Sequence, residues 1–261
     1  MSLNFVALLP LACFSPVQES GSVDDTSVAD TNDTSGSEET GDTNTGFSYR
    51  VTGDESAAAA LVAATLPTAM VIGTLFVQAD SLGCPEIVDD QQGALTITGG
   101  CTSESGTVYA GSVSMVETGI GVAVTFTQWQ VESAQAAFGA DGLVNVDEHF
   151  VFSGPALSAN YQSAGYGMPN SHAYQYADWS QDVSSSVFLP LNFSGSASID
   201  GDAVSLSGGW DWADECTSRP ATGALVAAGD NTTTFDFGGG CSQCVPWATT
   251  DGLSGEWCPP A

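Results

Sequence analysis

The chain has 261 residues, of which 31 are acidic and only two are basic, so its formal net charge is −29. A charge of this size repels nucleic acid and anionic membrane surfaces, and we expect neither as a partner. It is compatible with divalent cations or a basic partner. The same charge is also typical of proteins that stay soluble or that are adapted to high salt, where repulsion between like charges is screened.

The chain opens on an apolar run, Leu3 to Ala12, that ends directly at Cys13. Leu9, Leu11 and Ala12 before the cysteine resemble a lipobox, the motif that precedes the lipidated cysteine of bacterial lipoproteins. The run is short and no Lys or Arg precedes it, which departs from the usual signal peptide. We expect residues 1–13 to be a lipoprotein-type signal with Cys13 as the lipidation site. The alternatives are the remnant of an ordinary cleaved signal and a plain apolar N-terminus.

Residues 14–46 form a segment of Asp, Thr, Ser and Gly in which Asp-Thr steps recur, as at Asp25-Thr26 and Asp42-Thr43. The segment has little apolar surface to bury, so we expect a disordered acidic linker. A cysteine followed by such a linker resembles the surface lipoproteins of myxobacteria and related bacteria. The resemblance implies a lipid-anchored location at the bacterial outer membrane, facing outward, and it assigns no catalytic residue. The alternative location is secretion.

The remaining chain, residues 47–261, is long enough for a large folded domain. Its first feature is Ala57 to Val77, which contains no charged residue and on length alone could span a membrane. Pro67 and several Thr residues make the run only moderately apolar. We therefore expect a buried helix over about residues 55–78, kinked near Pro67, in preference to a membrane span.

Beyond the helix the sequence alternates apolar and polar residues with the period of two that is typical of strands. The apolar parity shifts between Phe126 and Trp129, which predicts a β-bulge. Three turn signals separate such runs: Asp141-Gly142, Asp200-Gly201 and Gly229 to Asn231. The clearest runs are Ile120, Val122, Val124 and Phe126, and then Val144, Val146, Phe150 and Phe152. Together they predict a mainly β fold: an antiparallel meander, sandwich or open barrel of short strands, with one N-terminal helix packed on it.

Residues 160–181 are rich in aromatic side chains and show neither a helical nor a strand period. A long aromatic loop on a rigid scaffold is a common place for a binding site, because aromatic faces stack on sugars or peptide groups. We therefore expect a ligand-binding loop here. The alternative is that the rings fold inward and pack the loop against the sheet. The candidate residues are Tyr161, Tyr166, His172, Tyr174, Tyr176 and Trp179. The second histidine, His149, is expected on a solvated face.

The seven cysteines leave six once Cys13 is assigned to the lipid, and an even number suits an extracytoplasmic disulfide framework. Proximity in the sequence favours three bridges, each stabilising by about 3 kcal/mol. The alternative is a zinc site, because Cys241 and Cys244 have C-x-x-C spacing and Cys216 and Cys258 could complete four thiolates. The expected bridges are Cys84 to Cys101, Cys216 to Cys241, and Cys244 to Cys258.

Residues with obvious chemistry are few. Gly-x-Ser-x-Gly is absent from the sequence, and the many carboxylates make pairs such as Asp147-Glu148 or Asp211 with Asp214 uninformative. Asp89-Asp90, and Asp200 with Asp202, are candidate calcium ligands without the spacing of an EF-hand loop. The N-x-Ser/Thr sequons begin at Asn32, Asn192 and Asn231. We assign no catalytic residue and no metal ligand.

These features favour a lipid-anchored surface protein with a non-enzymatic role in binding, adhesion or envelope structure. We expect a glycan or protein ligand, contact with the membrane through the lipid alone, and no cofactor other than calcium. Two alternatives remain: an extracellular hydrolase of glycans or peptides that uses carboxylates near residues 160–181, and an acidic calcium-binding head.

Overall fold

The computed structural model describes residues 46–183, 191–211, 222–238 and 244–258. Cys13 and most of the predicted linker lie outside these residues. The described chain contains one long helix, α1 (Asp54–Leu75), a single 3-10 turn, η2 (Ala164–Tyr166), and otherwise strands. The strands are β1 (Glu86–Asp89), β2 (Ala94–Thr98), β3 (Cys101–Thr102), β4 (Val108–Thr118), β5 (Gly121–Glu132), β6 (Ala136–Asp147), β7 (Val151–Ser163), β8 (Met168–Val183), β9 (Leu191–Ile199), β10 (Asp202–Asp211), β11 (Thr222–Ala228), β12 (Thr232–Asp236), β13 (Val245–Thr249) and β14 (Ser254–Trp257).

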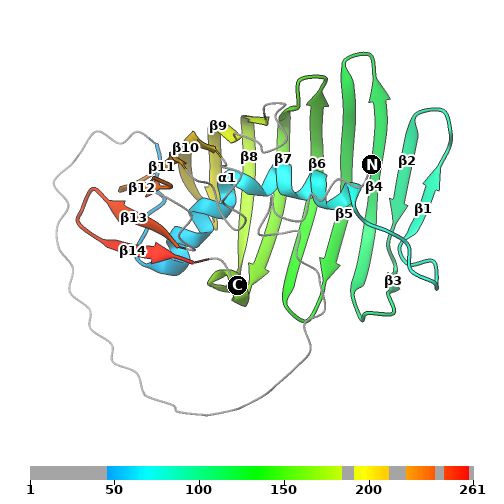
Figure 1. Ribbon diagram of the computed structural model, residues 1–261, viewed down its shortest axis with the longest axis horizontal. Coiled ribbons are helices and arrows are strands. Elements are labelled where there is room, and N and C mark those ends of the chain that lie inside the picture. The colour runs from blue at the N-terminus through cyan, green and yellow to red at the C-terminus, as the bar shows by residue number, and fades with distance from the viewer. Residues whose placement is uncertain (1–45, 184–190, 212–221, 239–243, 259–261) are drawn as a thin grey trace, which may run out of the picture.

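All the strands belong to one antiparallel sheet in which neighbours in the chain are neighbours in the sheet (Figure 1). The order runs from β1 to β14, with only β3 off this path, where it pairs with β4. The predicted meander is therefore confirmed, as an open single sheet rather than a sandwich. The expectation of short strands is wrong for its centre, because β4 to β8 are 11 to 16 residues long.

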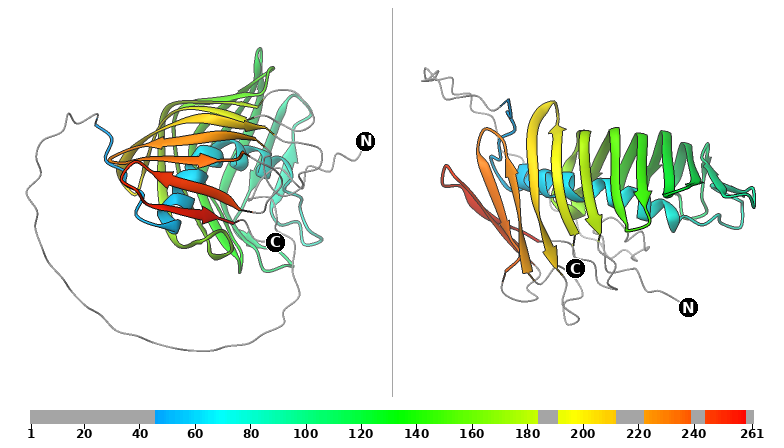
Figure 2. Two further views of the ribbon diagram at one scale, coloured as in Figure 1. Left: turned by 60° about the vertical axis from the view of Figure 1, so that its left-hand side comes forward. Right: turned by 90° about the horizontal axis from the view of Figure 1, so that it is seen from above.

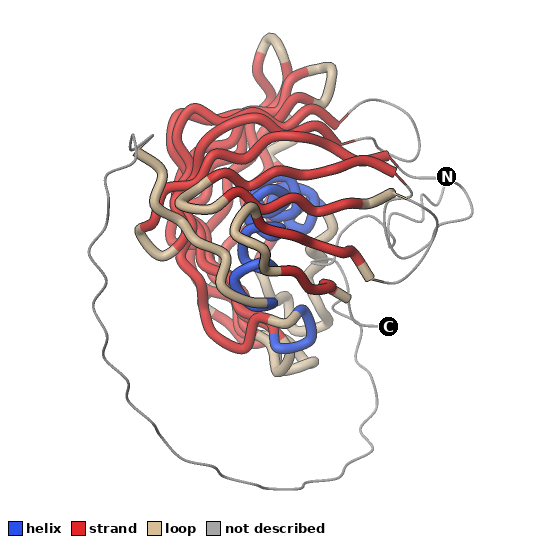
Figure 3. Tube along the Cα trace, turned by 90° about the vertical axis from the view of Figure 1, so that its left-hand side faces the viewer, coloured by secondary structure: helices blue, strands red, loops and turns tan. Residues whose placement is uncertain are grey.

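The sheet curls into a trough, and α1 lies in the trough with its axis across the strands (Figures 1 and 2). Viewed along the helix axis, the strands curve around one side of the helix (Figure 3). Long antiparallel strands twist, and bulges add local bends. Register shifts interrupt four successive strand pairs, from β4 with β5 to β7 with β8, and a fifth interrupts β8 with β9.

Helix α1 is buried on every side, since every residue from Ala57 to Val71 is buried. A helix without a polar face requires apolar surroundings all round, and the trough supplies them. Asp54 and Glu55 occupy the first turn, where negative charge is favourable. The helix is long and apolar enough to cross a membrane, yet 83% of its most apolar window is buried inside this protein. The prediction of a buried core helix is thus confirmed.

Pro67 interrupts the hydrogen bonding of α1, because proline has no N–H to donate to the carbonyl of Ala63 four residues earlier. The hydroxyl of Tyr176 on β8 donates to that carbonyl at 2.9 Å. Next to it, the N–H of Thr68 donates to Oε1 of Gln181 at 2.9 Å, and Nε2 of Gln181 donates to the carbonyl of Ala64. Strand β8 therefore supplies hydrogen-bond partners to the backbone groups of α1 around Pro67.

The segment before α1 is tied to the far end of the sheet. Buried Asn231, in the turn between β11 and β12, accepts from the N–H of Val51 at 3.0 Å and donates to its carbonyl at 2.9 Å. The guanidinium of Arg50 contacts Asp230 at 2.6 Å and Asp251 at 2.5 Å. The chain thus enters the helix from a fixed position at the end of the sheet near β12.

The predicted turns have mixed outcomes. Asp200-Gly201 joins β9 to β10 with both residues at positive φ, and the turn that contains Asn231 joins β11 to β12, as predicted. The bulge between Phe126 and Trp129 is also confirmed. The hairpin at Asp141-Gly142 is wrong: both residues lie inside β6, where Gly142 at φ 134° marks a register shift. Phe150 was expected in a strand, but it is exposed in the turn between β6 and β7.

Candidate functional site

The aromatic segment is not a loop. Residues 160–181 form the end of β7, η2 and most of β8, and the two strands pair along their length. Four of the six candidate side chains point into the trough and are buried: Tyr161, Tyr174, Tyr176 and Trp179. Their rings pack the core around α1, so the inward-packing alternative applies to them. Tyr166 lies in η2.

Burial in this core keeps the phenols neutral. Desolvation raises the pKa of Tyr161 to about 12. Desolvation also raises the pKa of Tyr174 and of Tyr176 well above the ordinary value of a phenol. Because the neutral hydroxyl of Tyr176 is a donor, it remains available to the carbonyl of Ala63 at ordinary pH.

The sixth candidate, His172, is the centre of a cluster of polar and charged side chains. Its side chain is 14% exposed and lies between two carboxylates. Nδ1 is 2.7 Å from Oδ2 of Asp200, and Nε2 is 3.5 Å from Oε1 of Glu55. Glu55 also accepts from Nδ2 of Asn170 at 2.9 Å. The cluster connects the first turn of α1 to β8 and to the β9–β10 turn.

This cluster lacks the arrangement of a hydrolytic triad. A triad needs a hydroxyl or thiol hydrogen-bonded to the histidine nitrogen opposite the carboxylate. Here the nitrogen opposite Asp200, Nε2, is buried and makes no hydrogen bond, and its nearest charged neighbour is Glu55. The geometry supports a positioning contact for the helix N-terminus. His149, by contrast, is exposed in the β6–β7 turn, as expected.

The other carboxylates singled out in the sequence serve turns. Asp147 accepts from the N–H groups of His149 and Val151, and these bonds lower its pKa, that of Val151 most. Asp90 has a lowered pKa because it accepts from the backbone of Ala94 and Gln92. Asp211 lies at the end of β10, whereas Asp214 lies outside the described residues. Asp147 and Asp90 are each engaged singly, at separate turns.

Two of the three predicted disulfides are present. Cys84 is bonded to Cys101 with a Cα–Cα distance of 5.9 Å, and Cys244 to Cys258 with one of 4.0 Å. The second bond consumes two of the four thiolates that a zinc site would need, so that alternative is wrong. The same bond accounts for the closeness of the two sulfur atoms in the group that they form with Glu256. Cys216 and Cys241 lie outside the described residues.

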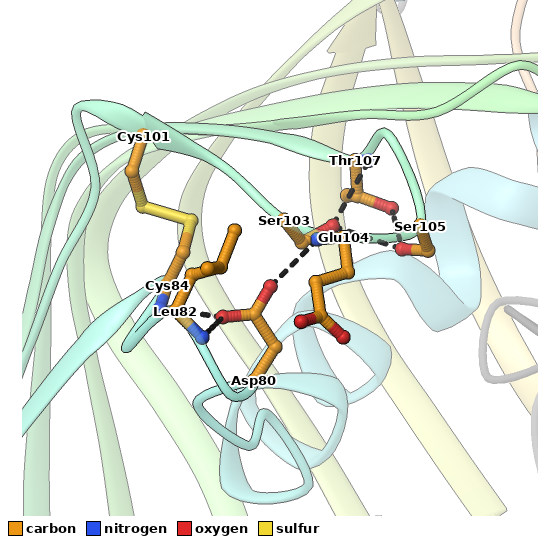
Figure 4. Close-up of a disulfide and its surroundings, with 8 residues drawn as sticks. All are labelled: Asp80, Leu82, Cys84, Cys101, Ser103, Glu104, Ser105 and Thr107. Atoms are coloured by element: carbon orange, nitrogen blue, oxygen red, sulfur yellow. Dashed lines mark hydrogen bonds between the residues drawn. A yellow bond between two sulfur atoms is a disulfide. The ribbon is translucent and has the colours of Figure 1, made fainter.

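The first disulfide closes a short corner beside β1 and β3 (Figure 4). Asp80 accepts there from the N–H groups of Leu82, Cys84 and Glu104 at 2.6 to 3.0 Å. These backbone bonds, that from Cys84 most, lower the pKa of Asp80. The disulfide and the hydrogen bonds of Asp80 together stabilise this corner, and the carboxylate of Asp80 is already hydrogen-bonded.

The convex face of the sheet carries hydroxyl side chains in rows that cross neighbouring strands. Ser180, Ser194 and Ser207 stand opposite one another on β8, β9 and β10. On β9 and β10, Ser196 and Ser205 form a second such pair. Near the other end of the sheet, Thr96, Ser114 and Thr125 form a similar row on β2, β4 and β5. This face is polar but carries few charges along these rows.

A hollow of about 560 Å³ lies on the convex face over β4 to β7. Gly111 and Gly139 contribute no side chain to it, and the side chains of Ala140 and Ala159 are buried on the opposite side, so the backbone forms its floor. Exposed polar side chains surround the floor: Gln128, Gln130, Asp141, Ser158 and Asn160.

No family model, curated protein or solved structure matches this chain.

The sequence did not single out any residue of the hollow as a binding residue. The only sequence signal was the predicted bulge between Phe126 and Trp129, which places Gln128 at positive φ beside the hollow. The strand pairing of Gln130, Gly139 and Asn160 brings together residues that are nine and twenty-one positions apart along the chain. Only the register of the sheet reveals that they share one face.

Proposed function

We propose that this protein is a surface-tethered, non-enzymatic binding protein that presents the convex face of its sheet outward. Cys13 is its lipid anchor, the acidic residues 14–46 are its tether, and the bacterial outer membrane is its location. The observation that carries the binding role is the hollow on the convex face, whose floor is open backbone and whose rim is polar.

The interior of the molecule supports this role, because α1 occupies the concave side of the sheet and buries the aromatic residues against itself. The residues that could perform chemistry have structural partners: His172 holds Glu55 and Asp200, and Asp147 and Asp80 hold turns. The convex face is the broad polar surface left for a partner.

The anchor is tested by labelling intact cells with a radioactive fatty acid. Wild-type protein is expected to incorporate the label in the membrane fraction, and Cys13→Ser protein to remain unlabelled. Equal labelling of the two proteins would defeat the anchor assignment. Digestion of intact cells by an added protease is expected to remove the head, since the tether places it outside.

The binding role is tested with purified full-length Cys13→Ser protein added to cells that lack it. Saturable binding is expected, and Ser158→Arg should weaken it, because this exposed side chain lies at the rim of the hollow. Ile120→Arg is the matched control, since Ile120 is 76% exposed in the β4–β5 turn. Equal loss in both variants, or no saturable binding, would contradict the proposal.

A further inference from the structure

The hollow on the convex face has an unusual rim. Gln128, Gln130 and Asn160 provide three side-chain amides, and Ser158 provides a hydroxyl. Within the described chain, none of these four side chains makes a hydrogen bond. Asp141, the fifth polar side chain at the rim, does make a bond: its Oδ1 accepts from the N–H of Gln128 at 3.1 Å. The rim therefore offers several donors and acceptors close together.

The shape of the hollow follows from missing side chains. Gly139 lies between Gln130 and Asn160 on the neighbouring strands, and a Cβ atom on it would come 2.2 Å from Oδ1 of Asn160. Gly111 has φ +71°, and a Cβ atom on it would come 2.1 Å from the carbonyl oxygen of Gln128. Gly139 therefore leaves room for the amide of Asn160 above the floor, and Gly111 lets the backbones of β4 and β5 approach closely at the bulge.

The charge of the hollow differs from that of the whole protein. Of the residues that line it, only Asp141 is ionisable, on a chain with a formal charge of −29. An anionic ligand would be repelled by the whole molecule. Calcium takes six to eight oxygen ligands and favours several carboxylates, which this rim lacks. A cation or an anion is therefore a poor match.

Apolar ligands are a poor match as well. The one aromatic residue at the hollow is Trp129, whose side chain is fully buried beneath it. Amide groups donate and accept at once, as do the hydroxyls of a sugar, and one amide can serve two neighbouring hydroxyls. The ligand chemistry that fits three amides, one hydroxyl and one carboxylate around a bare backbone floor is a neutral polyol.

We propose that this hollow binds a neutral carbohydrate chain, held by hydrogen bonds with Gln128, Gln130, Ser158 and Asn160, and by bonds that the carboxylate of Asp141 accepts. The inference rests on the proposed surface-binding function and names the ligand class for it. Without an exposed aromatic ring to stack on a sugar, a single site binds weakly. Many tethered copies on one surface would add their contributions along one polysaccharide.

The test uses ¹⁵N-labelled full-length Cys13→Ser protein, titrated with neutral oligosaccharides of glucose, mannose and galactose and with acidic oligogalacturonate. At least one neutral series is expected to shift the side-chain amide signals of Gln128, Gln130 and Asn160 in a saturable way, with oligogalacturonate far weaker. Gln130→Ala should weaken binding about fivefold, the equivalent of one ordinary hydrogen bond. Gln175→Ala, an exposed residue of β8 outside the hollow, is the matched control and should bind as wild type.

Gly139→Val should weaken binding more than tenfold, because it fills the floor and displaces the flexible side chain of Asn160. If this variant fails to fold, Asn160→Ala takes its place in the test, because Asn160 is exposed. Saturable binding by none of the neutral series, equal binding of oligogalacturonate, or unchanged affinity in Gln130→Ala would overturn the inference. If these tests fail while Ser158→Arg still weakens binding to cells, the proposed function stands and only the carbohydrate ligand is wrong.

Discussion

The hydroxyl of Tyr176 donates to the carbonyl of Ala63 at 2.9 Å, the helical acceptor that Pro67 deprives of its backbone partner. This one bond links the break in the helix to the middle strand of the sheet. Together with the bonds of Gln181 to Thr68 and Ala64, it fixes where along the trough the helix sits.

Tyr176→Phe is therefore expected to destabilise the protein by about 1 to 3 kcal/mol, because it leaves the buried carbonyl of Ala63 without a donor. Chemical denaturation monitored by circular dichroism measures the change. Tyr174→Phe is the matched control: Tyr174 is an equally buried tyrosine of β8, but its hydroxyl contacts only Sδ of Met168 at 3.7 Å. It should lose less stability.

Combining Tyr176→Phe with Pro67→Ala tests the cause. Alanine at position 67 restores an N–H for the carbonyl of Ala63, so the cost of Tyr176→Phe should fall when it is measured in the Pro67→Ala background. An identical cost in both backgrounds would show that the hydroxyl of Tyr176 acts independently of the helix break.

Alkaline pH should unfold the protein. Tyr161, Tyr174 and Tyr176 have raised pKa values in the folded state, that of Tyr161 about 12. Stability from these protonated phenols is complete below the unfolded pKa of about 10 and is lost as pH rises toward the folded values. Tyr161 alone accounts for roughly 3 kcal/mol once the pH exceeds its folded pKa. The added negative charge acts in the same direction on an already acidic protein.

Phenolate absorbance followed together with circular dichroism checks this expectation. Ionisation of the three core tyrosines should coincide with the loss of β structure above pH 10. Ionisation at the ordinary pKa with the fold intact would show that these phenols are accessible to solvent.

Asn231→Ala should cost about 2 to 3 kcal/mol, because it removes the buried amide that serves both the N–H and the carbonyl of Val51. The segment before α1 should then become sensitive to limited proteolysis. Asn192→Ala is the control, since Asn192 is exposed on β9. Both asparagines begin sequons, and in a glycosylating host the folded protein should accept a glycan at Asn192 and not at Asn231.

Removal of the Cys84–Cys101 bond by Cys84→Ser with Cys101→Ser should cost about 3 kcal/mol, the effect of closing a loop of this size. Peptide mapping of the unreduced protein should recover Cys84 linked to Cys101 and Cys244 linked to Cys258. Recovery of free thiols at any of these four positions would contradict the pairing.

The bulge between Phe126 and Trp129 was predictable because it depends on a local pattern. The two disulfides were predictable because each joins cysteines that are close in the sequence. In a meander, neighbours in sequence become neighbours in space, so proximity was a sound guide to pairing. The sequence of β8 did not show the period of a strand, and the reason is local. Asp178 has φ 51° and the register shifts between Ala177 and Ser180, which moves the inward positions from Tyr174 and Tyr176 to Trp179 and Gln181. The change of parity erased the strand period.

By itself, the sequence determined that this protein has an apolar helix and a succession of strands, since uncharged runs and alternating patterns reflect local burial. Only the tertiary structure decided that the helix fills the concave side, because a helix without a polar face has no preferred direction in its own sequence. It also decided that Gly139 lies between Gln130 and Asn160 on one face of the sheet. Such a site depends on strand register, which is set by the packing of the whole sheet rather than by any segment of the chain.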